Sequence, residues 1–515
     1  MDGFTPSSDP FILDSHARGE LWRILAETAE GFAGEVGDLS AGVRFEPAEV
    51  RRALERFDFD KPADPVQVLQ HAIDALRRLQ PQVGHPRHFG MFDPAPTTMG
   101  VLADALVSLF NPCLATWEGS PFGVETERHL IQAFAGRFGY PGEGADGIVT
   151  SGGSEANLTA LLIALAHRFP GYPQAGLRGL PGQPVVYCSA SAHPSVARAA
   201  RIAGLGDAAV HEVPMRTTGT MSGEALGKIS RVDREHGLIP LLVTATAGTT
   251  GEGVIDPIAE IGEVARGEGL WLHVDAAWGG AAVLLPELKP AFADIERADS
   301  ITFDPHKWMS VPMNCGMLLT RHPLLLRETF DVTAPFLRSQ EGGTPDPFTR
   351  GIRWSRGFAG LKLLLSLAVA GWDGYEHGLR RQVSLGDRLR DKLRAEGWSV
   401  VNETPLPVVC FADERWEGEP ERRFLTGVAA TVNASGAARV FVARTRGRHA
   451  LRACVTNHMT EAADVDMLVE LLASARRAGL SAGHLDTDVA EPSTDCDVDA
   501  CSTGVNFGTN RSVAG

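Results

Sequence analysis

The sequence of 515 residues lacks a basic excess, a disulfide framework and a long apolar run. Its 48 Lys and Arg residues are outnumbered by 64 Asp and Glu residues, which gives a formal net charge of −16. Because this charge repels phosphate backbones and anionic lipids, the composition disfavours nucleic acid and membranes as partners. No segment approaches the roughly 20 apolar residues of a membrane span. The start, MDGFTPSSDPF, also lacks the basic and apolar parts of a secretion signal.

The few cysteines and histidines point to neither disulfides nor a metal site. Cys496 and Cys501 lack the two-residue gap typical of a metal or redox pair. His85 and His88 are three apart, but Pro86 argues against a shared helix face and no carboxylate motif accompanies them. Without a secretion signal, the chain is expected to be a soluble cytoplasmic protein. The other cysteines are scattered, mostly in apolar stretches: Cys113, Cys188, Cys315, Cys410 and Cys454.

Hydrophobic periodicity divides the chain into four parts. Helical spacing of apolar residues predicts a helical N-terminal segment over 1–95. Over 96–375, strand candidates alternate with helical stretches, which indicates an α/β domain with a mostly parallel sheet. Short strands and a final helix predict a small α+β domain over 376–480, and the acidic tail 481–515 is expected to be disordered. The clearest strand candidates of the sheet are 184–189, 237–246, 270–277 and 299–304.

A glycine-rich segment, TSGGSEANLTALLIA at 150–164, indicates phosphate binding. Two glycines and a serine before a helix leave backbone N–H groups available at its N-terminus, which suits a phosphate. In the alternative reading, Ser154 and Asn157 simply cap the helix. No GK[ST] follows, so the segment is not a P-loop. The upstream GEGADG at 142–147 precedes an apolar run instead of following a strand, which is typical of a loop.

Three further segments follow predicted strands, where open α/β sheets bind their ligands. Asp275 ends a buried strand, so its carboxylate needs a cationic partner unless the residue only forms a turn. Lys307, in SITFDPHKWMS, follows a strand and a proline, where a desolvated amine could act as a nucleophile. Most lysines are solvated surface charges, however. His193 precedes a helix that Pro194 can start, and a lone histidine there is more often packed or capping than functional.

Together these four parts are suited to pyridoxal 5'-phosphate. The glycine-serine turn binds the phosphate, the imidazole stacks on the ring, and the carboxylate keeps the pyridine nitrogen protonated. The lysine forms the Schiff base, and the ring is then an electron sink for a carbanion at the α-carbon of an amino acid. The combination is more specific than any one part, and it predicts this cofactor and a small-molecule amino-acid substrate.

From about His85 to residue 478, the sequence resembles the group II pyridoxal-phosphate decarboxylases, which include aromatic-amino-acid, tyrosine and glutamate decarboxylases. The DPHKW segment is the specific point of this likeness. The resemblance implies fold type I, the aspartate-aminotransferase-like fold, and a homodimer whose active sites lie between subunits. It also implies a carboxy-lyase that cleaves the Cα–carboxylate bond of an L-amino acid and releases an amine.

The resemblance assigns roles to single residues. Lys307 would carry the cofactor and Asp275 would pair with the pyridine nitrogen. His193 would stack on the ring, and Ala277 would pack on its other face. Further cofactor contacts would come from Gly153, Ser154, Thr250, Asp304 and His306. The substrate pocket would include His88, Met91, Phe92, Cys113, Ala115, Trp117 and Arg356.

One departure from the family concerns the product. Family decarboxylases carry, on a loop after the lysine, a tyrosine that protonates the α-carbon. Counting from Lys307 without gaps puts Phe336 at that position in the substrate pocket, and none of the four tyrosines lies between 308 and 374. A phenyl ring cannot give a proton. Relatives with this exchange use dioxygen and release an aldehyde, ammonia and hydrogen peroxide, which is the alternative outcome here unless the loop is offset or His193 supplies the proton.

Substrate identity does not follow from the predicted pocket. Met91 and Ala115 stand where aromatic-specific relatives place rings, and Asp93 is a polar residue beside Phe92. Two other classes stay open. An aminotransferase on the same fold would release a keto acid instead of carbon dioxide, and a non-catalytic member of the family would keep the fold without forming the Schiff base.

Overall fold

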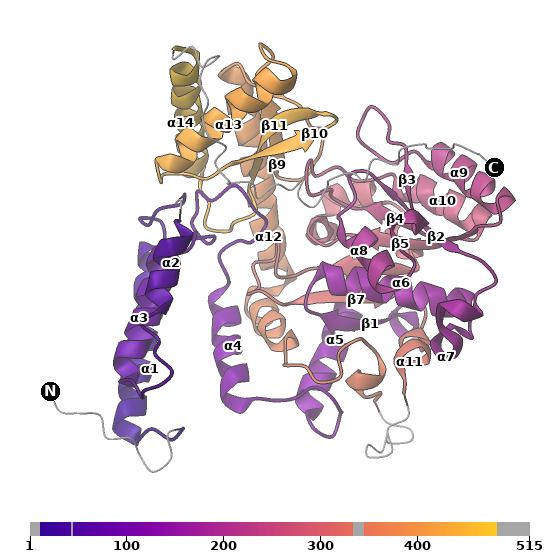
Figure 1. Cartoon of the computed structure of the whole chain (residues 1–515), viewed down its shortest axis with the longest axis horizontal. Coiled ribbons are helices and arrows are strands. Elements are labelled where there is room, and N and C mark those ends of the chain that lie inside the picture. Colours follow the sequence, from indigo (N-terminus) through magenta and orange to yellow (C-terminus); the bar gives the residue numbers. More distant parts are fainter. Residues whose placement is uncertain (1–10, 43–44, 333–343, 482–515) are drawn as a thin grey trace, which may run out of the picture.

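The computed structural model describes residues 11–42, 45–332 and 344–481, and Figure 1 shows how they are arranged. A seven-stranded sheet forms the centre of the larger part of the molecule, with the strand order β1-β7-β6-β5-β4-β2-β3. Only β7 runs against its neighbours. The predicted α/β fold with a mostly parallel sheet is therefore confirmed. The strands are β1 (Asp146–Thr150), β2 (Pro184–Ser189), β3 (Val210–Val213), β4 (Ile239–Thr246), β5 (Trp271–Asp275), β6 (Ser300–Phe303) and β7 (Gly316–Thr320).

Helices cover both faces of this sheet, which explains why its central strands read as continuous apolar runs. Two neighbouring residues of β4 enter different cores: Leu242 packs in the core beneath α6, and Val243 packs in the core on the opposite face. The helices of this part are α5 (Pro121–Arg137), α6 (Gly153–Arg168), α7 (Tyr172–Ala175), α8 (Ser195–Ile202), α9 (Gly223–Glu235), α10 (Ile258–Glu268) and α11 (Leu325–Phe330).

The crossover connections bring the carboxyl ends of the parallel strands to one edge. Because β1 and β6 both pair antiparallel with β7, β1 runs in the same direction as β6, and its end lies at that edge as well. Short 3-10 helices complete the connections: η1 (Gly142–Gly144), η2 (Gly176–Gly179), η3 (Asp207–Ala209), η4 (Gly279–Leu284), η5 (Pro286–Phe292), η6 (Ile295–Arg297) and η7 (Pro347–Thr349).

The C-terminal part contains a four-stranded antiparallel sheet with the order β10-β11-β9-β8 and its own apolar core. Strand candidates at 398–401, 408–411 and 451–456 in the sequence overlap β8, β9 and β11, whereas β10, a half-exposed strand at the edge of the sheet, matches none of them. Helix α12 (Gly360–Ala395) joins both parts and bends at Gly371, whose φ is 63°. It runs through the predicted boundary at 375/376. The other elements are β8 (Ser399–Val400), β9 (Val408–Ala412), α13 (Gly418–Ala434), β10 (Phe441–Thr445), β11 (Arg448–Cys454) and α14 (Ala462–Ser481).

The N-terminal helices are poorly covered by the rest of the chain. Figure 1 shows α1 (Ser15–Glu35), α2 (Pro47–Leu54) and α3 (Pro65–Arg78) standing apart from the large sheet, and none of the three has a buried residue. Helix α4 (Thr98–Phe110) exposes 65% of Leu109 and 77% of Phe110 at its end. In the described ranges, no helix combines the length and apolarity needed to cross a membrane.

Candidate active site

A cavity of about 310 Å³ lies at the carboxyl edge of the large sheet. Residues that directly follow β1, β2, β4, β5 and β6 line it, as expected for an open α/β fold. The structure therefore brings together segments that are far apart in the sequence. The nine residues predicted to contact the cofactor are all among its lining: Gly153, Ser154, His193, Thr250, Asp275, Ala277, Asp304, His306 and Lys307.

Lys307 is held in the cavity by Asp304. A turn after β6 closes with the Lys307 N–H donating to the Asp304 carbonyl over 3.0 Å, and Lys307 Nζ lies 3.1 Å from Asp304 Oδ2. Burial alone would lower the pKa of this lysine. The carboxylates of Asp304 and Asp275 outweigh burial, so the pKa of Lys307 is raised. In this cavity the two acids therefore favour the ammonium form of Lys307.

The glycine turn after β1 lies very close to the end of β6. The Gly153 N–H donates to Asp304 Oδ2 over 2.9 Å, and a Cβ on Gly153 would come within 2.9 Å of the same oxygen. Neither Ser154 nor Asn157 caps α6, contrary to the alternative reading of the sequence. Ser151 instead donates its N–H and its hydroxyl to the Glu155 carboxylate. The missing side chain of Gly153 therefore allows the turn to lie directly against Asp304.

Asp275 is held by neutral donors. Its Oδ1 accepts the Ala277 N–H over 3.1 Å, and its Oδ2 accepts from Asn157 Nδ2 over 2.8 Å. The cationic partner expected from the sequence is absent at ion-pair distance among the described residues, although the charge of Lys307 is close enough to interact with it. Directional N–H donors orient a carboxylate as well as a counterion would, and they leave its charge available to a ligand.

His193 lines the same cavity from the loop between β2 and α8. Its ring is exposed to the cavity, and Nδ1 lies 2.8 Å from Ser195 Oγ. Partial burial lowers the pKa of His193, against the opposing effect of Asp275. The imidazole is therefore neutral at ordinary pH. A flat neutral ring of this kind is suited to covering the face of an aromatic ligand.

Sequence reasoning assigned no cofactor contact to six polar or aromatic residues of the cavity: Ser151, Glu155, Asn157, Ser195, Thr246 and Trp278. Asn157 lies one helical turn after Gly153, and Trp278 directly follows Ala277. Helical spacing from the glycine turn could have pointed to Asn157. Nothing local distinguishes Ser195 or Thr246 from ordinary residues at a strand or helix end.

Of the described residues predicted for the substrate pocket, none lines the cavity within one chain, although Asp93 beside Phe92 is close enough to interact with the charge of Lys307. Phe92 comes nearest, because its ring stacks on Trp278 at 4.5 Å between centroids. His88 is buried, and burial lowers its pKa to about 4. The Trp117 backbone N–H donates to Asp346 Oδ1 over 2.6 Å, its indole N–H donates to Glu125 Oε1 over 3.0 Å, and the Ala115 carbonyl accepts from Phe348. Met91 and Cys113 are exposed at the surface.

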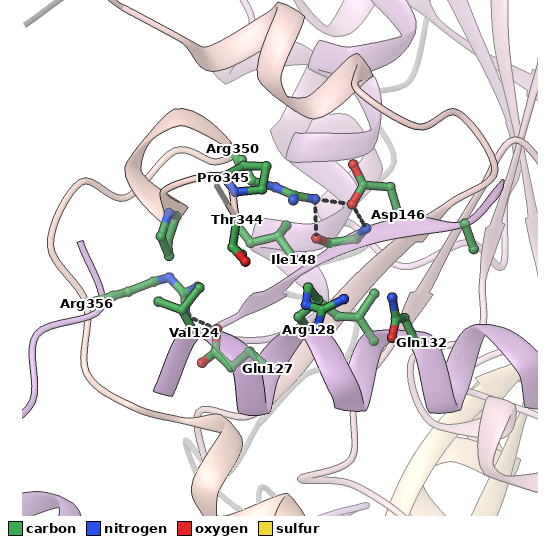
Figure 2. Close-up of a pocket in the computed structure, with 14 residues that line it drawn as sticks. Val124, Glu127, Arg128, Gln132, Asp146, Ile148, Thr344, Pro345, Arg350 and Arg356 are labelled. Atoms are coloured by element: carbon green, nitrogen blue, oxygen red, sulfur yellow. Dashed lines mark hydrogen bonds and ion pairs between the residues drawn. The ribbon is translucent and has the colours of Figure 1, made fainter. Parts of the chain in front are cut away.

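Arg356 differs most from its expected place, because it lines a second pocket of about 140 Å³. Figure 2 shows it beside Glu127, with Nη1 of Arg356 2.5 Å from Oε2 of Glu127. Burial raises the pKa of Glu127 in spite of this arginine. On the other side of the pocket, Arg350 contacts Asp146. Arg356 thus compensates a buried acid in one chain and does not face Lys307.

Arg452 links the C-terminal part of the chain to the cavity. Its side chain is 1% exposed, and its two terminal nitrogens donate to the carbonyls of Thr250 and Gly90, over 2.8 and 2.6 Å. The guanidinium also lies over the ring of Phe92. One arginine therefore connects the loop of the predicted cofactor-contacting threonine to the segment that contains Phe92.

The loop position Phe336 and the tail 482–515 lie outside the described residues. All four tyrosines of the chain are among the described residues, and none of them lines the 310 Å³ cavity. Tyr140 donates to the Ala298 carbonyl and Tyr187 to Asp233, so two of the phenols have structural partners.

Comparisons with known proteins agree with this geometry. A family model described as "Pyridoxal-dependent decarboxylase conserved domain" matches residues 47–413. An aromatic-L-amino-acid decarboxylase from Bacillus atrophaeus is 32% identical over 354 residues, 68% of this chain and 72% of that protein. An L-2,4-diaminobutyrate decarboxylase from Acinetobacter baumannii is 28% identical over 463 residues, 86% of this chain and 88% of that protein. The crystal structure of mouse CSAD in apo form has a TM-score of 0.84 at 25% identity, covering 90% of this chain and 99% of that one.

Proposed function

This chain belongs to the pyridoxal-dependent decarboxylase family, and from that premise we propose how its residues divide the work of the reaction. It is a carboxy-lyase that decarboxylates an amino acid with pyridoxal 5'-phosphate. The observation that carries the assignment of residues is the meeting of Lys307, Asp275 and His193 in one cavity with the glycine turn of α6.

The residues of the cavity fit the cofactor. The cavity has a volume of about 310 Å³, which suits a small ligand, and the N-terminus of α6 at one end of it is suited to binding an anion. Ser151, Ser154 and His306 line that end. The buried hydroxyl of Thr246 also lines the cavity and has no hydrogen-bond partner among the described residues. We assign the phosphate to the α6 end and the pyridine nitrogen to Asp275.

When bound, pyridoxal phosphate supplies an aldehyde that reacts with amines and a ring that withdraws electrons from the α-carbon. We assign the reacting amine to Lys307, whose side chain is 26% exposed. Asp304, 3.1 Å from Nζ, is placed to take the ammonium proton when the neutral amine is needed. Asp275, oriented by two N–H donors, would hold a proton on the ring nitrogen. His193 and Ala277 would cover the two faces of the ring.

Decarboxylation also requires a proton at the α-carbon after carbon dioxide leaves. Because no tyrosine lines the cavity, the chain's own candidate donors there are Nε2 of His193 and Nζ of Lys307. Protonation of the α-carbon by either donor gives one amine and one carbon dioxide for each amino acid consumed. If this protonation is slow, one dioxygen and one water would be consumed for each amino acid, and the products would be aldehyde, ammonia, carbon dioxide and hydrogen peroxide. We propose the amine as the main product, and the oxidative route, suggested by the absent phenol, as the second candidate.

A homodimer is the proposed assembly, with cytoplasmic location kept as a prediction. Support comes from the exposed apolar side chains of α4 and from α1 and α3, which bury no residue within one chain. The substrate segments at 88–92 and 113–117 lie outside the cavity of their own chain, so a second copy would bring one such set to each site. The substrate remains open, since the relatives described above are named for aromatic amino acids and for diaminobutyrate.

The test is a panel of carboxyl-labelled amino acids given to protein loaded with pyridoxal phosphate. Labelled carbon dioxide, amine, aldehyde, peroxide and oxygen uptake should be followed together. We expect carbon dioxide and amine in equal amounts from at least one substrate. Aldehyde and peroxide in equal amounts would favour the oxidative route, a keto acid without carbon dioxide would indicate an aminotransferase, and no product from any amino acid would contradict the proposal.

A further inference from the structure

A chain of hydrogen bonds runs beneath the cavity from Trp271 to His193. Trp271 Nε1 donates to Ser300 Oγ over 2.8 Å, and Ser300 Oγ lies 2.8 Å from Nδ1 of His273. Nε2 of His273 lies 3.0 Å from Oδ1 of Asn157. The nitrogen of the same amide, Nδ2, lies 2.8 Å from Asp275 Oδ2 and 2.8 Å from Ser195 Oγ. Every side chain from Trp271 to Ser195 along this path is buried.

The hydrogen bonds in this chain all run in one direction, from Trp271 toward Asp275, because the groups at its two ends allow no other. The indole N–H of Trp271 can only donate, and the Asp275 carboxylate can only accept. Asn157 must therefore direct Nδ2 toward Asp275, since the flipped amide would set two acceptor oxygens against each other. Its Oδ1 then faces Thr302 Oγ1, 2.7 Å away, and the imidazole of His273, both of which can donate.

This direction decides the tautomer of His273. Burial lowers the pKa of His273 to about 4, so the ring carries one proton at neutral pH. Oδ1 of Asn157 needs a donor, which places that proton on Nε2. Nδ1 is then free to accept from the Ser300 hydroxyl, whose oxygen already accepts from Trp271. Every proton of this branch has a partner.

The same logic continues to the other histidine. Asn157 has two amide hydrogens, and the geometry gives one to Asp275 and one to Ser195. Because Ser195 Oγ accepts from Asn157, its own hydrogen goes to Nδ1 of His193, which also accepts the Ser195 backbone N–H over 3.2 Å. His193 therefore carries its proton on Nε2, the nitrogen that is not engaged by Ser195.

We propose that Asn157 is a positioning residue that orients the Asp275 carboxylate and, through Ser195, sets the tautomer of His193. This inference rests on the proposed function, in which Asp275 and His193 face the two reactive features of the cofactor. One buried amide thus couples the proton on the ring nitrogen to the N–H that His193 presents to the cavity. An apolar side chain of the same size at 157 would pack but would lose both bonds at once.

The first test reads the histidine directly in the cofactor-free protein. Solid-state ¹⁵N spectra of histidine-labelled protein should contain a His193 pair with Nε2 protonated and Nδ1 unprotonated, identified by its loss in His193→Gln. Ser195→Ala should give a mixture of the two tautomers, because only the longer bond of 3.2 Å from the backbone N–H of residue 195 then holds Nδ1 of His193. Asn157→Leu should give a mixture as well, because the Ser195 hydroxyl is then free to turn away from His193. A His193 protonated on Nδ1 in the unaltered protein would overturn the direction of the chain.

The second test separates positioning from packing. Asn157→Leu should weaken cofactor binding by about 10- to 100-fold, since hydrogen bonds to charged groups contribute most, and should lower kcat more than it changes KM. Asn157→Asp should weaken binding further, because a second carboxylate then faces Asp275. Ser195→Ala should leave binding nearly unchanged, since it breaks only the His193 branch.

Asn457→Leu is the matched control, because Asn457 is a buried asparagine whose three hydrogen-bond partners, Gly84, His85 and Met459, do not line the cavity. It should lower the melting temperature of the cofactor-free protein as Asn157→Leu does, without the loss of cofactor affinity. Equal cofactor affinity in Asn157→Leu, Asn157→Asp and the unaltered protein would contradict the proposal. Failure of the proposed function would look different, since the unaltered protein would then bind no cofactor while the His193 spectrum stayed as predicted.

Discussion

The carboxyl edge of the large sheet and the N-terminal helices differ in how far one chain completes them. At the sheet edge, Lys307, Asp275 and Asn157 have hydrogen-bond or ion-pair partners within the same chain. Around α1, α3 and α4, apolar side chains are left exposed, and the neighbouring substrate segments do not reach the cavity. Under the proposed function, a single chain would build the cofactor half of the site, and a second copy would complete the substrate half.

Replacing the reacting amine should have the largest effect on the cofactor half. Lys307→Ala should lower kcat by at least about 10³-fold, since it removes the nucleophile and one proton carrier of the cavity. The visible band of the bound cofactor should disappear as well. Absorbance spectra and carbon dioxide release check both outcomes. Turnover at the unaltered rate would mean that another amine reacts with the cofactor.

Local sequence patterns predicted the residues of this half because each lies just after a strand. Lys307 in DPHKW and Asp275 in HVDAA could be recognised from a few neighbours, and the parallel sheet then brings them together. Helical spacing could place Asn157 near the glycine turn, but it could not identify the partners Ser195 and Asp275, which are 38 and 118 residues away. The raised pKa of Lys307 also depends on Asp304 and Asp275 together, and no single segment of the sequence contains all three.

The residues predicted for the substrate half are not in the cavity lining of one chain. These residues were assigned by resemblance to dimeric enzymes, and within one chain Arg356 neutralises Glu127 while Trp117 bonds to Asp346. A contact made by another copy leaves no trace in the sequence beyond exposed apolar residues. Such residues are typical of surfaces that other chains cover, but they do not identify which residues meet.

Disrupting the α4 surface should separate the two halves. Leu109→Asp combined with Phe110→Asp places two charges at the most exposed apolar end of α4 and should convert dimer to monomer. We expect turnover to fall by about 10²-fold or more, because a substrate that is held out of place reacts that much more slowly. The absorbance band of the bound cofactor should remain. Light scattering and turnover are measured on the same sample.

Ile202→Asp is the control for this variant, since Ile202 is comparably exposed but lies on α8. It should change neither the mass in solution nor the turnover. A monomeric double variant with full activity would show that one chain completes both halves.

Loosening the connection through Arg452 should have a smaller effect. Arg452→Met keeps the apolar stem but loses the donors to the carbonyls of Thr250 and Gly90. Cofactor affinity should fall by about tenfold, with a similar rise in KM, because both loops lose a charge-assisted bond. Arg448→Met on the same strand is the control, since Arg448 pairs with Glu421 instead. Equal losses in both variants would mean that Arg452 only stabilises the C-terminal sheet.

The pH dependence of cofactor capture should show the smallest change. Capture needs the neutral amine, and Asp304 and Asp275 raise the pKa of Lys307 against the effect of burial. The rate should therefore rise as pH increases toward that pKa. Asp304→Asn removes one of the two charges and should shift the profile to lower pH. Stopped-flow absorbance measures both profiles, and identical curves would refute the role of Asp304.

The most direct measurement traps the linkage between cofactor and protein. Protein loaded with pyridoxal phosphate should be reduced with borohydride, digested and sequenced by mass spectrometry, with Lys307→Ala as the reference. The account predicts a phosphopyridoxyl group on the peptide that contains Lys307 and on no other peptide. A reduced cofactor attached to a different lysine, or none attached at all, would contradict it.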